Sequence, residues 1–262
     1  MYNSIPIQLQ QLFQFYVQLI TYELGDVVYG IYIYGSVALG HFNEEKSDID
    51  FMTFLNRDLT EDELKKLKGV HDKLNTISPY AEKLEGEYIN VQDVRIGNYS
   101  REYPYFAYGK YQGVVGIKTF SLFQIKERGL KIYGEDFSTI VNEIEWFDIR
   151  NDLGERLNEY WIKKGKNPLI LMFDGWISLI VLTLCRIYYI LEKETVASKF
   201  DSAEFVIENV DEKYTLLIQE AMRIQQNTSS VSLFSSKLER KKITRQFVEY
   251  MVNTCNERFK LA

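Results

Sequence analysis

The chain has 262 residues, enough for one large domain or two modest ones. Hydrophobic residues make up 46% and charged residues 26%, the balance of an ordinary soluble globular protein. The net charge of −6 argues against nucleic acid as the main partner, because phosphate contacts need clustered Lys and Arg, and it suits a cationic small substrate.

Targeting and metal-binding signals of the usual kinds are missing from the sequence. The N-terminus has no basic region followed by an apolar run, so no signal peptide is expected. The longest apolar stretch, 176–184, is too short to cross a bilayer. Cys185 and Cys255 belong to no Cys/His cluster, so no zinc site is expected. These features predict a cytoplasmic protein, and we expect a monomer that binds neither nucleic acid nor membrane.

The first part of the chain mixes helices and strands. The helices are indicated by apolar residues at helical spacing and, at Thr60 and Glu63, by a capping box. The strands are rich in β-branched and aromatic residues. In chain order, the predicted elements are a helix over 7–24, strands over 27–34 and 48–55, a helix over 60–74, a strand over 88–94 and a helix over 117–130.

The second part of the chain has helical periodicity and almost no strand signal. Candidate helices cover 149–165, 173–193, 201–208, 212–225 and 233–259. The sequence therefore predicts two domains. An α/β (α+β) domain with a small mixed sheet occupies 1–150, and an all-α helical bundle occupies 151–262.

Two short segments combine the residue types that bind a metal–nucleotide complex. The first predicted strand runs into Gly35-Ser36, where a residue without Cβ lets the backbone approach a phosphate and a hydroxyl can donate to it. A helix opening over 37–39 would add its N–H groups. Asp48 and Asp50 are two residues apart, so their side chains share one face of the second strand.

Two neighbouring carboxylates repel each other unless a cation lies between them. Mg²⁺ suits this position because it takes carboxylate, water and phosphate oxygens. It would neutralise a triphosphate and stabilise the charge on the leaving pyrophosphate. A third carboxylate is needed to deprotonate a hydroxyl or complete the metal site, and Glu85 and Glu87 offer two choices. The alternative is that these four acids are ordinary surface carboxylates.

This arrangement resembles the nucleotidyltransferase superfamily that includes DNA polymerase beta. The motif of that superfamily is G-S, some ten residues, D-x-D, and a later acidic residue on a neighbouring strand. Gly35, Ser36, Asp48 and Asp50 match the motif. The resemblance identifies 1–150 as a nucleotidyltransferase domain.

Further segments resemble the streptomycin/spectinomycin adenylyltransferases, and length and domain order agree with that family. The resemblance implies transfer of AMP from ATP to a hydroxyl of a small molecule, such as an aminoglycoside or aminocyclitol, with Mg²⁺ as cofactor and release of pyrophosphate. The helical domain would bind the substrate. The matching segments are 47–50, Leu84-Glu85, Tyr103-Pro104, Tyr108-Gly109, 181–189 and 196–199.

The resemblance also implies residue roles. The glutamate of the Leu-Glu segment is the catalytic base of the family, which maps to Glu85, with Glu87 as the alternative. An Arg and a Lys thirteen residues apart contact the triphosphate, and Arg186 and Lys199 have that spacing. Gly35, Ser36 and Ser47 complete the expected nucleotide site. Unless the resemblance holds, Arg186 and Lys199 are solvated residues of a helical domain. ATP is expected to bind between the domains.

Departures from the family concern the acceptor. Streptomycin-reading members place an Asp ten residues before that Arg, where this chain has Trp176, and the nearest acid is Asp174. Their tryptophan after the Tyr-Pro segment is replaced by Tyr111. A nucleotide-stacking tyrosine is absent, with Gln225 near its place. We expect Tyr111, Asp174 and Trp176 at the substrate site, although core packing is the alternative for Trp176. Spectinomycin, another aminocyclitol or an unrelated metabolite is the expected acceptor.

Two other functions stay open at this point. A nucleotidyltransferase could modify a protein, as some toxin–antitoxin members of the superfamily do, with the helical domain as the docking surface. The chain could also be a non-catalytic nucleotide-binding module. The D-x-D pair argues against a pure binder, because such a module has no need of two repelling carboxylates side by side.

Overall fold

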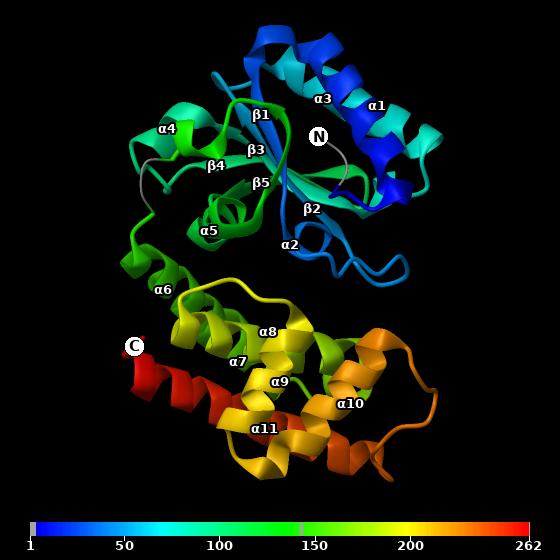
Figure 1. Cartoon of the computed structure of the whole chain (residues 1–262), viewed down its shortest axis with the longest axis vertical. Helices are drawn as coiled ribbons and strands as arrows, with labels where there is room; N and C mark the ends of the chain where they lie inside the picture. The colour runs from blue at the N-terminus through cyan, green and yellow to red at the C-terminus, as the bar shows by residue number, and fades with distance from the viewer. Residues whose placement is uncertain (1–3, 142–143, 262) are drawn as a thin grey trace. The chain divides into compact units, whose positions relative to one another are not determined.

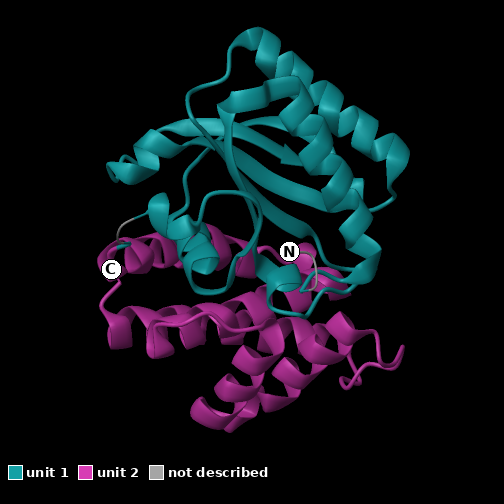
Figure 2. Ribbon diagram, turned by 45° about the horizontal axis from the view of Figure 1, so that its top comes forward, with its two compact units in different colours: residues 1–144 teal, residues 145–262 magenta. Residues whose placement is uncertain are grey.

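The computed structural model describes residues 4–141 and 144–261. It divides the chain into two compact units, 1–144 and 145–262, which Figure 2 colours separately. The boundary predicted from the sequence is at residue 150. The first unit contains the strands and the second unit is helical, which confirms the expected fold class.

Unit 1 is built on one mixed sheet. Within the described residues, the sheet has six strands in the order β5-β4-β3-β2-β1-β6, and the β2–β3 pair is parallel. The strands are β1 Val28–Ile33, β2 Ile49–Leu55, β3 Leu84–Asn90, β4 Glu102–Ala107, β5 Lys110–Gly116 and β6 Leu130–Gly134. The helices of this unit are α1 Ile7–Leu24, α2 Gly35–Ala38, α3 Glu61–Ile77, α4 Val91–Arg95 and α5 Thr119–Arg128.

The prediction of a third strand over 88–94 was wrong in its position. β3 lies four residues earlier, and residues 91–95 form helix α4. The side chain of Asn90 ends the strand, because its Oδ1 accepts a hydrogen bond from the Gln92 N–H and so caps the helix. Two predictions for this unit were confirmed. Helix α1 has the predicted bounds, and the capping box of Thr60 and Glu63 opens α3.

The two faces of the sheet have different coverings. Figure 1 shows α1 and α3 over one face, with α5 on the other. Tyr16 of α1 shares hydrogen bonds of 2.8 Å with Thr53 and Tyr88, and His71 Nε2 of α3 lies 2.7 Å from the Tyr88 hydroxyl. Successive strand residues point to opposite faces. The odd-numbered Glu85 and Glu87 of β3 therefore point away from α1 and α3.

Unit 2 is organised around one long helix. The helices are α6 Trp146–Glu155, α7 Ile162–Lys166, α8 Asp174–Lys193, α9 Lys199–Asn209, α10 Thr215–Gln226 and α11 Lys237–Phe259, with a π-helical turn over Arg156–Trp161. Helix α8 packs against α9, α10 and α11. It is the single described helix long and apolar enough to cross a membrane. This differs from the prediction that the apolar stretch 176–184 is too short to do so. However, 61% of the most apolar 18-residue segment of α8 is buried inside the protein, as in a core helix.

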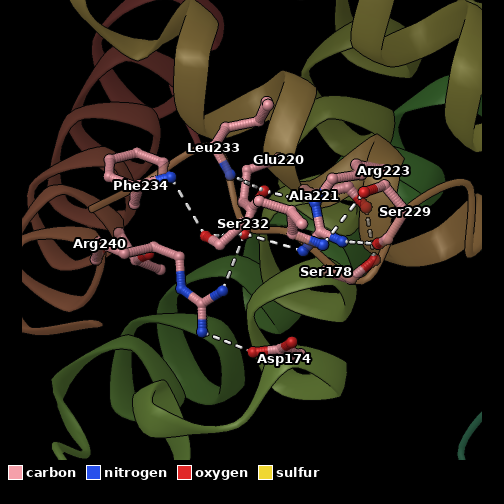
Figure 3. Close-up of polar contacts among 12 residues, drawn as sticks. Asp174, Ser178, Glu220, Ala221, Arg223, Ser229, Ser232, Leu233, Phe234 and Arg240 are labelled. Atoms are coloured by element: carbon pink, nitrogen blue, oxygen red, sulfur yellow. Dashed lines mark hydrogen bonds and ion pairs between the residues drawn. The ribbon is translucent and has the colours of Figure 1, made fainter. Parts of the chain in front are cut away.

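A charged cluster lies inside unit 2 (Figure 3). Glu220 of α10 is fully buried and accepts hydrogen bonds from Arg223 at 2.7 and 3.0 Å and from Arg240 Nη1 at 2.9 Å. The Ser232 hydroxyl and the Leu233 N–H add two more, at 2.6 and 3.0 Å. Burial by itself would raise the pKa of Glu220, but these hydrogen bonds together lower it to about 2.

Arg240 extends this cluster to a third helix. It belongs to α11, is 2% exposed, and donates a second hydrogen bond of 2.6 Å from Nη2 to Asp174 Oδ1 in the first turn of α8. Charge-assisted hydrogen bonds of this kind are stronger than neutral ones. The cluster therefore joins α8, α10, α11 and the segment that contains Ser232.

Candidate active site

The Gly35-Ser36 turn lies directly against Asp50. The Tyr34 N–H donates a hydrogen bond of 3.1 Å to the Asp50 carbonyl oxygen, which aligns the end of β1 with the start of β2. Gly35 has a φ of +65°, and a Cβ added there would lie 1.9 Å from Asp50 Oδ2. Glycine is required here both by its backbone conformation and by the neighbouring carboxylate.

Ser36 offers a donor that the fold does not use. Its Oγ is buried and has no hydrogen-bond partner within the described residues. Such hydroxyls are rare, because leaving a buried polar atom unpaired costs about 1–3 kcal/mol. Ser36 belongs to α2, a short helix that begins at Gly35 rather than at 37 as expected. An oxygen-rich ligand placed at this turn would satisfy the hydroxyl.

The loop before β2 places Asp48 and Ser47. The Ser47 hydroxyl accepts a 3.0 Å hydrogen bond from the Asn43 N–H, and the Ser47 N–H donates one of 2.8 Å to the Asn43 carbonyl oxygen. Ser47 therefore shapes the turn that leads into the strand. Asp48 is exposed and precedes β2, which begins at Ile49 and not at residue 48 as predicted.

The parallel register of β2 and β3 separates the two glutamates. Asp50 is the partner of Glu85, whereas Glu87 is the partner of Met52, one step further from Asp48. Glu85 is half-buried and Glu87 is 5% exposed. The structure therefore brings Asp48, Asp50 and Glu85 together at the start of two neighbouring strands and places Glu87 deeper.

Burial is the main cause that raises the pKa of Glu85, and the charge of Asp48 raises it further. A hydrogen bond from the Tyr105 hydroxyl and the charge of Lys118 act in the opposite direction. The pKa of Tyr34 is also raised, first by burial and then by three nearby carboxylates, so its hydroxyl stays protonated. The site thus concentrates negative charge in a partly desolvated position.

Sequence reasoning missed Tyr34, Tyr105 and Lys118. Tyr34 directly precedes the glycine of the motif, and Lys118 is the residue before α5. Tyr105 lies on β4, a strand that is not among the predicted elements, and Pro104 within it weakens the strand signal. Side chains alternate between the two faces of a strand. With the register of β4 against β3 known, Tyr105 would therefore have been predicted on the same face as Glu85.

The acidic residues suit Mg²⁺ in their chemistry. Among the residues that the structure describes, no group of three or more His, Cys, Asp or Glu is arranged to hold a metal by itself. Mg²⁺ in nucleotide sites is usually bound by one or two carboxylates, with waters and substrate phosphates as the other ligands. Asp50 lies against the Gly35 turn and Asp48 is two residues before it, just ahead of the start of β2, so the two carboxylates offer the hard oxygen donors that this pattern requires.

Tyr111 lies away from these carboxylates. It pairs with Phe106 across β4 and β5, and its ring lies 5.5 Å from the Phe106 ring, on the face covered by α1 and α3. Lys68 Nζ of α3 lies 4.1 Å from the centre of the Tyr111 ring. The structure therefore does not bring Tyr111 together with Asp50 and Glu85, which are on the opposite face.

The remaining predicted residues all belong to unit 2. Arg186 is in the middle of α8 and half-buried, and Lys199 is the first residue of α9. Asp174 and Trp176 are in the first turn of α8. Asp174 is bound to Arg240, and Lys164 Nζ lies 4.8 Å from the Trp176 ring centre. Their roles stay predictions.

Comparison with known proteins gives two family matches, one in each unit. Residues 14–95 match the nucleotidyltransferase domain, and residues 176–254 match the C-terminal domain of aminoglycoside adenylyltransferase. The chain belongs to the aminoglycoside adenylyltransferase family of the nucleotidyltransferase superfamily. It is therefore an enzyme of the nucleotidyltransferase class.

A solved structure shares this fold over nearly the whole chain. The crystal structure of spectinomycin adenyltransferase AAD(9) from Enterococcus faecialis, with ATP and spectinomycin, superposes with a TM-score of 0.71. The match covers 93% of this chain and 97% of the other, at 17% sequence identity. Among curated proteins, no sequence matches the chain significantly.

Proposed function

We propose that this enzyme transfers AMP from ATP to a hydroxyl group of an aminoglycoside or aminocyclitol, with Mg²⁺ as cofactor and pyrophosphate as the second product. The observation that carries the proposal is the Asp50 carboxylate packed against the Gly35 turn, beside the unpartnered Ser36 hydroxyl. This arrangement supports the proposal because a metal ion bound to Asp50 would lie near a donor for a phosphate oxygen.

Unit 1 would bind the nucleotide and the metal. Asp48 and Asp50 would hold Mg²⁺, which supplies charge neutralisation for the triphosphate when bound. Ser36 would donate its free hydroxyl hydrogen to a phosphate oxygen. Gly35 would keep the turn close to Asp50, and Ser47 would hold the loop that presents Asp48.

Glu85 is the better candidate for the base. It is half-buried and in register with Asp50, whereas Glu87 is 5% exposed and one step deeper. Its raised pKa increases its affinity for a proton at neutral pH. In the proposed step, the acceptor oxygen attacks the α-phosphorus, the bond to the pyrophosphate oxygen breaks, and the hydroxyl proton passes to the Glu85 carboxylate.

Unit 2 would supply the other contacts. By the family resemblance, Arg186 and Lys199 would bind the triphosphate, and Asp174 and Trp176 would contact the acceptor. The similar structure contains ATP and spectinomycin, so ATP is the proposed co-substrate and spectinomycin is the first acceptor to test. The burial of α8 within unit 2 supports a core helix and not a membrane span. A cytoplasmic location and a monomeric state remain part of the proposal.

The test is a transfer assay with purified protein, ATP labelled at the α-phosphate, Mg²⁺ and a panel that includes spectinomycin and streptomycin. We expect labelled acceptor and pyrophosphate in equal amounts, with no product when Mg²⁺ is chelated. When Asp48 or Asp50 is replaced by asparagine in this assay, the variant Asp62→Asn is the control for a general loss of negative charge, because Asp62 is an exposed residue of α3. Label that moves only to proteins in a lysate, with none on the panel, would contradict the small-molecule acceptor.

A further inference from the structure

The Glu85 carboxylate is held from a neighbouring strand. The Tyr105 hydroxyl on β4 donates a hydrogen bond to Glu85 Oε1 on β3. Tyr105 is the antiparallel partner of Glu87, so it projects from the same face of the sheet as the two glutamates. The backbone register of two paired strands therefore fixes the position of the donor relative to the carboxylate.

This hydrogen bond restrains the part of the glutamate that is least fixed by packing. Rotation about the bond to the carboxyl group of a glutamate is broad and roughly two-fold. A donor on Oε1 fixes the plane of the carboxylate and leaves Oε2 to accept a proton. Burial and the charge of Asp48 favour the protonated form of Glu85, and the Tyr105 hydroxyl favours the charged form that a base requires.

Lys118 is a weaker restraint on the same carboxylate. Its side chain is exposed, and its charge is the smallest influence on the Glu85 pKa. Charges at exposed positions are screened by water and salt. Tyr105 donates a direct hydrogen bond to Glu85, and its side chain is half-buried in the sheet.

We propose that Tyr105 is a positioning residue for the reaction: its hydroxyl holds the Glu85 carboxylate in the orientation that accepts the acceptor's proton. This inference rests on the proposed function. It assigns to Tyr105 an effect on the chemical step and none on nucleotide binding.

The same strand offers a matched control. Tyr103 lies two residues earlier on β4, and its hydroxyl donates to the carboxylate of Asp93 on α4. Asp93 follows the C-terminal end of β3, whereas Glu85 is near the start of that strand. Tyr103→Phe and Tyr105→Phe therefore each remove one tyrosine–carboxylate hydrogen bond from β4, but only the second removes it from Glu85.

The kinetic experiment compares these variants in the transfer assay. A hydrogen bond to a charged group corresponds to a change of about 10- to 100-fold. We expect Tyr105→Phe to lower kcat by about that factor with the KM for ATP changed less than about twofold, because the contact acts in the chemical step. Tyr103→Phe should change kcat less than about twofold. Adding Tyr105→Phe to Glu85→Gln should cause no further loss.

A second readout does not depend on turnover. In protein labelled with carbon-13 at the glutamate carboxyl carbons, the Glu85 signal is assigned by its loss in Glu85→Gln. We expect this signal to move in Tyr105→Phe and to stay in place in Tyr103→Phe. An unmoved signal, or an unchanged kcat in an active protein, would overturn the role of Tyr105. Absence of any transfer by the wild type would instead contradict the proposed function, and the carbon-13 comparison would still decide whether Tyr105 holds Glu85.

Discussion

Glu220 in unit 2 and Glu85 in unit 1 are both withdrawn from water, but their neighbours are of opposite kinds. Glu220 is surrounded by the guanidinium groups of Arg223 and Arg240, and its pKa is lowered to about 2 although burial opposes this. Glu85 has the hydroxyl of Tyr105 as its hydrogen-bond donor and Asp48 as a charged neighbour, and its pKa is raised. One glutamate is fixed in a single charge state, and the other can exchange a proton.

The difference distinguishes a carboxylate that stabilises the fold from one that is available for chemistry. Pairing with arginine satisfies a buried charge, but it also suppresses its basicity. Placing Glu85 beside Asp48 and Asp50 opposes stability, because like charges repel. Perturbed carboxylates of this second kind are typical of functional sites. The following experiments test this contrast.

The largest effect is expected for Asp50→Asn. A metal ion that neutralises a triphosphate contributes several kcal/mol to the reaction, so loss of one carboxylate ligand should lower kcat/KM at least about 1,000-fold. Stability should be retained, because the substitution removes one of several repelling charges. The transfer assay and thermal unfolding measure the two quantities. Activity within about tenfold of wild type would show that Asp50 is a structural residue.

Arg240→Met should have the largest effect on stability. It leaves Glu220 and Asp174 without one of their donors, and breaking a buried ion pair costs about 3–5 kcal/mol. Arg245→Met is the control on the same helix, because the exposed pair of Arg245 with Glu249 is worth less than about 1 kcal/mol. Denaturant unfolding gives both free energies. Equal losses of unfolding free energy in the two variants would show that the buried interactions of Arg240 stabilise the fold no more than an exposed ion pair does.

Gly35→Ala should impair catalysis more than the matched substitution Gly40→Ala. Both glycines have a positive φ, at +65° and +74°, so both variants carry similar backbone strain. Only at position 35 does the new Cβ meet Asp50 Oδ2, whereas position 40 has nothing within 4 Å. Displacement of a catalytic group by about 1 Å can cost about 100-fold in rate. Similar kcat/KM values for the two variants would contradict the close approach of Asp50.

The smallest effect is a difference in pH dependence between the units. Burial lowers the pKa of His71 in unit 1 to about 3, below the ordinary value of 6.5. Between these two pH values the unfolded chain binds a proton that the folded chain does not. The free energy of unfolding of unit 1 should therefore decrease by about 1 kcal/mol as the pH falls from 7 to 5.5. Glu220 has a lowered pKa, so its contribution in unit 2 is kept until the pH falls below about 4.5.

Hydrogen exchange in α3 and in α10 separates these two responses. Glu85 acts in the opposite direction to His71, because its raised pKa makes the fold bind protons more readily. The loss due to His71 is therefore the difference between wild type and His71→Phe. If both proteins show the same change in α3 protection between pH 7 and 5.5, His71 does not have the assigned role.

The sequence predicted those parts of the molecule that depend on local patterns. The bounds of α1, the capping box of α3 and the spacing of Asp48, Asp50 and Glu85 can all be read within short segments. The position of Tyr111 on the far face and the contact of Tyr105 with Glu85 depend on the register of β3, β4 and β5, which no local pattern specifies.

Unit 2 shows the same limit. The helices were predicted from apolar spacing, but the pairing of Glu220 with Arg240 joins residues of two helices. Charged residues in a helical pattern are normally expected on the solvated face. The burial of this pair follows from how α8, α10 and α11 pack, and composition gives no sign of it.

The central claim is that Asp48 and Asp50 bind a divalent cation together with the nucleotide at the Gly35-Ser36 turn. Electron paramagnetic resonance of Mn²⁺ with ATP measures this directly, with or without an acceptor. The account predicts that wild-type protein depletes the signal of free Mn²⁺–ATP and that the double variant Asp48→Asn/Asp50→Asn, although folded, does not. Equal depletion by both proteins would contradict the claim.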